Sequence, residues 1–98
     1  MDWKLFEELT QLHGVSGYEK QVSAFVAERM KDHADKVWTD VNGNLIVFKK
    51  GASPNAKKLL FCAHMDEIGL QVIKINDDGT VMVKGLGSCW IYTTYQSR

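Results

Sequence analysis

The sequence lacks several features that would assign it at once to a class of protein. Its 98 residues include twelve basic and twelve acidic side chains, so the formal net charge is zero. Because no basic excess is available to attract a phosphate backbone, we predict no nucleic-acid partner. The longest apolar run covers only Leu59 to Ala63, whereas a membrane-spanning helix needs about 18 apolar residues. We therefore predict no contact with a membrane.

Cysteine is also scarce. The two cysteines, Cys62 and Cys89, form neither a CxxC pair nor a disulfide framework. The first residues, MDWKLFEEL, are acidic and amphipathic, unlike the basic and then apolar pattern of a secretory signal. Reduced thiols in the cytosol are the simplest interpretation, and we predict a cytoplasmic location.

Hydrophobic spacing predicts two helices in the first third of the chain. Residues 3–12 place apolar side chains on one helical face. Ser16 and Glu19 match a capping box, in which each side chain bonds to the backbone N–H of the other residue. A second amphipathic helix is therefore expected from about residue 17 to residue 32.

The next part of the chain predicts strands. Val37–Val41 and Asn44–Lys49 are extended runs joined at Asn42-Gly43, a dipeptide typical of tight hairpins. Residues 58–63 are apolar on both faces, which predicts a central strand of a sheet.

A meander of strands is expected after that segment. Residues 68–73 alternate like a strand with one buried face. Residues 76–79 predict a turn, and residues 80–84 predict the returning strand. Gly85–Gly87 predicts a hinge-like break, and residues 90–96 predict a further strand.

The run His64-Met65-Asp66-Glu67 places polar residues directly after the predicted central strand. Such positions deliver functional side chains in α/β sheets, and residues two apart on an extended chain face the same side. A neutral imidazole is a good ligand for zinc or cobalt. A nearby carboxylate can accept the other imidazole N–H and orient the ring. His64 and Asp66 are therefore a candidate pair of metal ligand and orienting carboxylate.

Several motifs carry a resemblance to one family. AHMDEIG, residues 63–69, resembles the metal-site motif of the tetrahedral-type cytosolic metalloaminopeptidases. This is the glutamyl and deblocking aminopeptidase family, whose members are also called cellulase M or endoglucanase. GVSGYE, residues 14–19, resembles its first-loop motif, and DVNGNL, residues 40–45, resembles its hairpin. Residues 77–79 and 85–87 fall where that family leaves its catalytic domain for an inserted dimerisation domain.

The resemblance implies an α/β fold and a division of the chain. Residues 1–67 would form the N-terminal part of a zinc-peptidase-like α/β domain, with two helices followed by strands. Residues 68–98 would begin a small inserted β-domain of the dimerisation type. The resemblance also implies a homo-oligomer built through that β-domain.

The resemblance further implies a co-catalytic site of two divalent metal ions, zinc or cobalt, that removes amino acids from the N-termini of peptides. In that site His64 would be a metal ligand, and Asp66 would be the catalytic carboxylate that orients His64. We assign no catalytic role to Glu67. His13 and His33 are not expected to supply further ligands, because they lie near predicted helix ends.

The remaining metal ligands and the general base of the family lie beyond the region that these 98 residues match. One histidine cannot hold a catalytic metal, which usually needs three protein ligands. We therefore predict that the isolated chain is inactive, and its status as an enzyme stays open. The alternative is a non-catalytic truncated remnant or interaction module that associates with a full-length partner through exposed strands, including the aromatic run at residues 90–95. A third interpretation, an unrelated α+β binding domain, would make several matched motifs coincidental.

Overall fold

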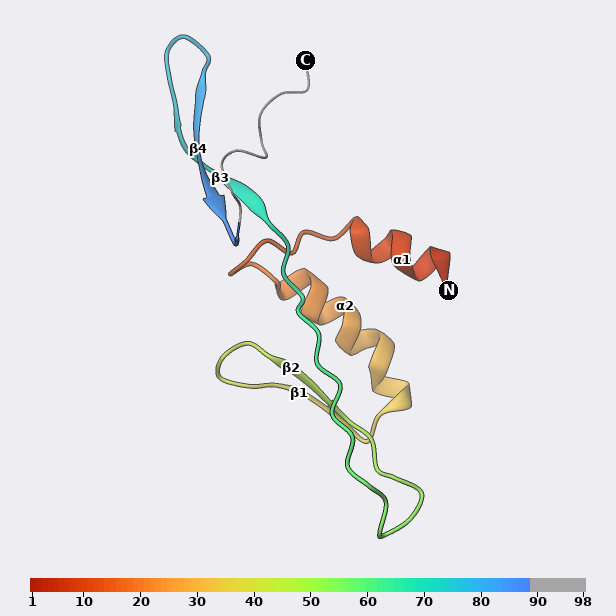
Figure 1. Cartoon of the computed structure of the whole chain (residues 1–98). Coiled ribbons are helices and arrows are strands. Elements are labelled where there is room, and N and C mark those ends of the chain that lie inside the picture. Colours follow the sequence, from red (N-terminus) through yellow and green to blue (C-terminus); the bar gives the residue numbers. More distant parts are fainter. Residues whose placement is uncertain (89–98) are drawn as a thin grey trace.

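Two short helices precede four strands in the computed structural model, which describes residues 1–88 (Figure 1). The elements are α1 (Trp3–Thr10), α2 (Lys20–Met30), the 3-10 helix η1 (Lys31–His33), β1 (Lys36–Thr39), β2 (Leu45–Phe48), β3 (Gly69–Ile75) and β4 (Val81–Leu86). This order confirms the predicted fold class of two helices followed by strands. The strand and the interaction surface predicted at residues 90–96 lie outside the described residues.

The first helix begins as its sequence dictates and ends earlier than predicted. The Asp2 carboxylate accepts a hydrogen bond of 3.1 Å from the backbone N–H of Leu5, which caps the helix. The helix ends at Thr10 rather than at residue 12, because the next turn tightens. The N–H groups of Gln11 and Leu12 bond to carbonyls three residues back, not four.

The capping box predicted for the second helix is wrong. Helix α2 begins at Lys20 and has no side-chain cap. The Ser16 hydroxyl donates to Asp66, and the Glu19 carboxylate accepts from the N–H of Gly17 at 2.6 Å. An ionised carboxylate is a stronger partner for a hydroxyl than a backbone amide, so a tertiary contact replaces the local cap.

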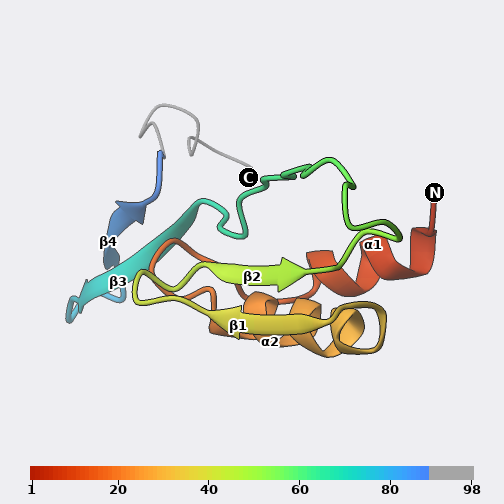
Figure 2. The same cartoon turned by 90° about the horizontal axis from the view of Figure 1, so that it is seen from below.

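Strands β1 and β2 form an antiparallel hairpin that packs on α2 (Figure 2). Thr39 pairs with Leu45, and the N–H of Asp40 bonds to the carbonyl of Asn44 at 3.0 Å. The hairpin predicted at Asn42-Gly43 is therefore confirmed, but its turn is longer than the predicted two residues. The Asp40 carboxylate organises this longer loop. It accepts bonds of 2.9 Å from the N–H of Asn42, the N–H of Asn44 and the side-chain amide of Asn44. Gly43 supplies the positive φ of 86° that the loop requires.

This loop should depend on pH. The side-chain bond from Asn44, followed by that residue's backbone N–H, holds the pKa of Asp40 below its ordinary value of 3.8. Because the folded-state pKa is the lower one, this contribution to stability is present above pH 3.8 and is lost as pH falls through the folded pKa. We expect the Asn44 amide resonance to move toward its unfolded position under acid conditions. In an Asp40→Asn variant that titration should vanish, and its persistence would assign the effect to another carboxyl.

The segment at residues 58–63 is not a strand, contrary to prediction. It runs as an extended, unpaired chain between the two hairpins (Figure 1). Leu60 and Phe61 are 87% and 89% exposed. A strand that is apolar on both faces needs neighbouring strands and covering layers. Within residues 1–88 the sheets contain only β1 with β2 and β3 with β4, so that environment is not formed.

Strands β3 and β4 form the second antiparallel hairpin, with a bulge between Val72 and Lys74. The predicted turn is confirmed by the bond of 2.9 Å from the N–H of Asn76 to the carbonyl of Thr80. The predicted break at residues 85–87 is wrong in part, because β4 continues through Leu86. The predicted buried face is also wrong, since the hairpin stands away from the helices (Figure 1).

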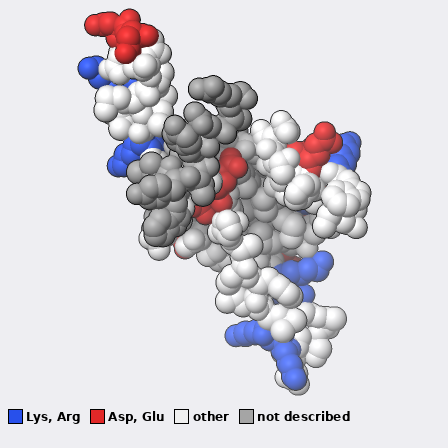
Figure 3. Space-filling model, turned by 45° about the horizontal axis from the view of Figure 1, so that its top comes forward, with Lys and Arg blue, Asp and Glu red and all other residues white. Residues whose placement is uncertain are grey.

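The described part of the chain is open rather than closed around a core. Its Cα radius of gyration is 18.5 Å, compared with about 13 Å for a compact domain of 100 residues. Within residues 1–88 no hydrophobic side chain is fully buried. Figure 3 shows acidic side chains at the tip of the β3–β4 hairpin and basic side chains at the opposite end of the molecule. No helix in this part is long and apolar enough to cross a membrane.

Candidate functional site

The polar run His64–Glu67 follows the unpaired segment at residues 58–63. It lies directly against the loop between α1 and α2. Val15 and Glu67 form an isolated parallel β-bridge. The N–H of Glu67 donates to the carbonyl of Gly14 at 2.8 Å, and the N–H of Ser16 donates to the carbonyl of Glu67 at 3.3 Å. The backbone therefore joins two motifs that are far apart in the sequence.

Glycines make this close approach possible. A Cβ atom at Gly14 would lie 2.7 Å from Cγ2 of Val22 and 3.2 Å from the carbonyl oxygen of Met65. A Cβ atom at Gly69 would lie 2.6 Å from Cγ2 of Val15. Both distances to side-chain carbons are shorter than carbon atoms tolerate, so the bridge requires residues without a side chain at these positions.

Three side chains form a chain of hydrogen bonds at the bridge. Nδ1 of His64 lies 3.1 Å from Oδ1 of Asp66 and 2.9 Å from the Asp66 carbonyl oxygen. Oδ2 of Asp66 accepts from the hydroxyl of Ser16, across 50 positions of sequence. The structure thus brings together His64 and Asp66, the two residues that the sequence singled out, and adds Ser16.

The electrostatics of the site favour an ionised Asp66. The hydrogen bond from Ser16, followed by the one from His64, holds the pKa of the Asp66 carboxyl below its usual value. Both atoms that face Nδ1 of His64 are acceptor oxygens, so a neutral imidazole must place its proton on Nδ1. Nε2 then retains its lone pair, and the His64 side chain is 85% exposed.

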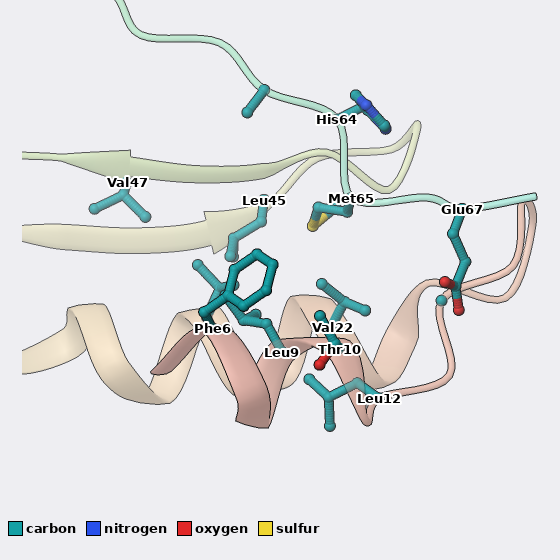
Figure 4. Close-up of a pocket in the computed structure, with 13 residues that line it drawn as sticks. Phe6, Leu9, Thr10, Leu12, Val22, Leu45, Val47, His64, Met65 and Glu67 are labelled. Atoms are coloured by element: carbon teal, nitrogen blue, oxygen red, sulfur yellow. The ribbon is translucent and has the colours of Figure 1, made fainter. Parts of the chain in front are cut away.

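A pocket of about 480 Å³ lies beside the site, between the helices, β2 and the segment that precedes Asp66. In Figure 4, Met65 points toward the apolar side chains of the helices, and the His64 ring lies on the other side of the backbone. The lining residues are Phe6, Leu9, Thr10, Leu12, Gly14, Val22, Val26, Leu45, Val47, Ala63, His64, Met65 and Glu67. Its lining is mostly apolar, so the pocket itself is not a metal site.

The donor set at this site fits part of a metal centre. Nε2 of His64 is an exposed lone pair on an oriented ring, which is what a divalent metal requires of a histidine ligand. Among residues 1–88 no group of three His, Cys, Asp or Glu side chains could hold a metal ion. His13 and His33 therefore join no such group, and further ligands would have to come from other segments.

Sequence reasoning missed the role of Ser16 in this arrangement. Ser16 and Glu19 have capping-box spacing, which predicts a helix cap at Ser16. The one signal that pointed elsewhere was the GVSGYE motif itself, which is part of the family resemblance. Only the parallel bridge places that loop beside Asp66.

Comparisons with known proteins place the sequence among aminopeptidases. The family model for M42 glutamyl aminopeptidase matches residues 43–98. The chain is 41% identical to a lysyl aminopeptidase from Pyrococcus furiosus over 88 residues, which cover 89% of this chain and 25% of that protein. The chain thus spans about a quarter of the length of this relative.

Two solved structures are also similar. One is an aminopeptidase from the archaeon Desulfurococcus kamchatkensis, with 46% identity and a TM-score of 0.79 over 89% of this chain and 24% of the other. The second is an endoglucanase from Thermotoga maritima, with 44% identity and a TM-score of 0.73 over 84% of this chain and 26% of the other.

Proposed function

The chain belongs to the M42 glutamyl aminopeptidase family, and from this we propose that it supplies part of the active site of a metal-dependent aminopeptidase. The observation that supports the proposal is the hydrogen-bonded chain of Ser16, Asp66 and His64, which leaves Nε2 of His64 exposed. In this proposal His64 is a metal ligand, and Asp66 is the carboxylate that orients it.

The proposed reaction is hydrolysis of the N-terminal residue of a peptide. Two divalent ions, zinc or cobalt, would supply Lewis acidity that polarises the scissile carbonyl. Asp66 would hold the proton of His64 on Nδ1, so that Nε2 stays available as a ligand. An imidazole suits zinc and cobalt equally well, so His64 does not select between them.

The same proposal extends to the domain organisation, the assembly and the location of the protein. Residues 1–67 would belong to the catalytic domain and residues 68–98 to the beginning of an inserted β-domain. Homo-oligomers would form through that β-domain, and the protein would be cytoplasmic. These assignments are supported by the resemblance of the motifs to the family and by the separate position of the β3–β4 hairpin (Figure 1).

We also propose that these 98 residues alone do not hydrolyse peptides. Among residues 1–88 no group of three His, Cys, Asp or Glu side chains could hold a metal ion, and a catalytic metal usually needs about three ligands from the protein. The second candidate function is a non-catalytic module that associates with a full-length partner. The exposed apolar side chains of Leu59, Leu60 and Phe61 favour it.

A pair of assays tests the proposed function. The isolated chain should release no amino acids from peptides in the presence of zinc or cobalt. A chimera, in which the matched residues of this chain replace their counterparts in the Pyrococcus furiosus relative, should regain metal-dependent release. A chimera that is folded by circular dichroism but inactive with either metal would contradict the aminopeptidase proposal and favour the module. Activity of the isolated chain would contradict the predicted need for further ligands.

A further inference from the structure

We propose that Ser16 is a positioning residue of this site: its hydroxyl fixes the Asp66 carboxylate, and through it the ring of His64. The use of His64 as a ligand rests on the proposed function. The positioning itself is a property of these three side chains, and it can be measured without any enzymatic activity.

The two oxygens of Asp66 serve different partners. Oδ2 accepts from the Ser16 hydroxyl, and Oδ1 lies 3.1 Å from Nδ1 of His64. The terminal torsion angle of an aspartate, χ2, has only a weak preference and adopts a broad range of values. A partner on Oδ2 therefore determines where Oδ1 points. Without the hydroxyl, the carboxylate is free to turn toward water, because Asp66 retains 38% exposure of its side chain.

Ser16 itself is held firmly enough to act in this way. Its N–H bonds to the carbonyl of Glu67, next to Asp66 in the chain. On the other side, a Cβ atom added at Gly87 would lie 3.4 Å from the Ser16 oxygen. The backbone of Ser16 is thus tied to the His64–Glu67 run by a hydrogen bond, and the chain just after β4 passes close to its hydroxyl.

His64 depends on this support because little else contacts its ring. Its side chain is 85% exposed, and its hydrogen-bond partners among the described residues are both atoms of Asp66. The carbonyl oxygen of Asp66 is a neutral acceptor. The carboxylate is charged and forms the stronger bond, so loss of its orientation should weaken the preference for a proton on Nδ1.

The test is to determine by nitrogen-15 NMR which ring nitrogen of His64 carries the proton in the full 98-residue chain. Spectra would be recorded at about pH 8, where an ordinary histidine with a pKa near 6.5 is neutral. In the unsubstituted chain we expect a protonated Nδ1 and an unprotonated Nε2. A proton found on Nε2 in that chain would overturn the proposal without any variant.

Three variants separate positioning from general stability. In Ser16→Ala we expect the two nitrogen shifts of His64 to move toward each other, as both tautomers become populated. Ser16→Thr keeps a hydroxyl and should restore the original shifts. Ser53→Ala is the control, because that hydroxyl accepts from Asn55 in an exposed loop and should leave His64 unchanged. Unaltered His64 shifts in a folded Ser16→Ala chain, or Ser16→Thr shifts that match those of alanine, would overturn the role of the hydroxyl.

The outcome is independent of the proposed enzymatic function. A shift of the tautomer in Ser16→Ala, together with an inactive chimera, would retain the positioning role and remove the aminopeptidase proposal. Conversely, an active chimera together with an unchanged His64 tautomer in Ser16→Ala would support the aminopeptidase proposal and remove the positioning role of Ser16.

Discussion

Replacing His64 by alanine should lower the activity of the chimera by more than about 100-fold. Loss of a residue that only orients a metal ligand typically costs about 10–100-fold in activity or metal affinity, and loss of the ligand itself should exceed that. The proposal assigns His64 the ligand position because Nε2 is exposed and Nδ1 is held by Asp66. The measurement is the rate of release of an N-terminal residue at saturating metal.

His33→Ala is the matched control for that experiment. His33 is the last residue of η1, is exposed, and contributes to no group of potential ligands, so its loss should leave the rate unchanged. If His64→Ala retained most of the activity while the chimera bound metal normally, His64 would not be a ligand.

Replacing Gly69 by alanine should break the contact that builds the site. The added Cβ would lie 2.6 Å from Cγ2 and 2.9 Å from Cγ1 of Val15, so the loop must move away from the motif. Overpacking of this kind typically costs about 1–3 kcal/mol. The expected readouts are a lower free energy of unfolding in urea and a loss of hydrogen-exchange protection at the N–H of Glu67, which bonds to Gly14.

The double variant Val15→Ala/Gly69→Ala tests the cause of that loss. Alanine at residue 15 removes both carbons that the new Cβ would strike, so the second substitution should recover part of the stability that the first one costs. Such non-additivity is expected of residues in direct contact. If the two effects simply added, the clash would not be the reason for the loss, and the close approach at Gly69 would not matter for the bridge.

Several features were predictable because they depend on neighbours in the sequence. The amphipathic helices and the two hairpins arise from side chains within a few positions of the backbone that they contact. The pairing of His64 with Asp66 belongs to this class, since residues two apart on an extended chain face the same side. The family was also recognisable from motifs, and the comparisons confirm it.

Other features failed because a competing hydrogen-bond acceptor was overlooked, in one case far away in the chain and in another close by. Ser16 and Glu19 have the spacing of a capping box, yet the hydroxyl bonds to Asp66, a charged acceptor 50 positions away. The loop at residues 40–44 is longer than the Asn-Gly pair predicted, because Asp40 bonds to Asn42 and Asn44. In each case the stronger acceptor prevailed over the local pattern.

The sequence by itself determined the helices, the hairpins, the family and the His64–Asp66 pair, because each rests on short-range spacing or on a contiguous motif. Only the tertiary structure decided that the loop at Gly14 and Val15 bridges to Glu67 and that Ser16 joins the site. It also decided that residues 58–63 stay unpaired. The physical reason is that a hydrogen bond or a strand pairing needs a partner, and its position is a property of the folded chain.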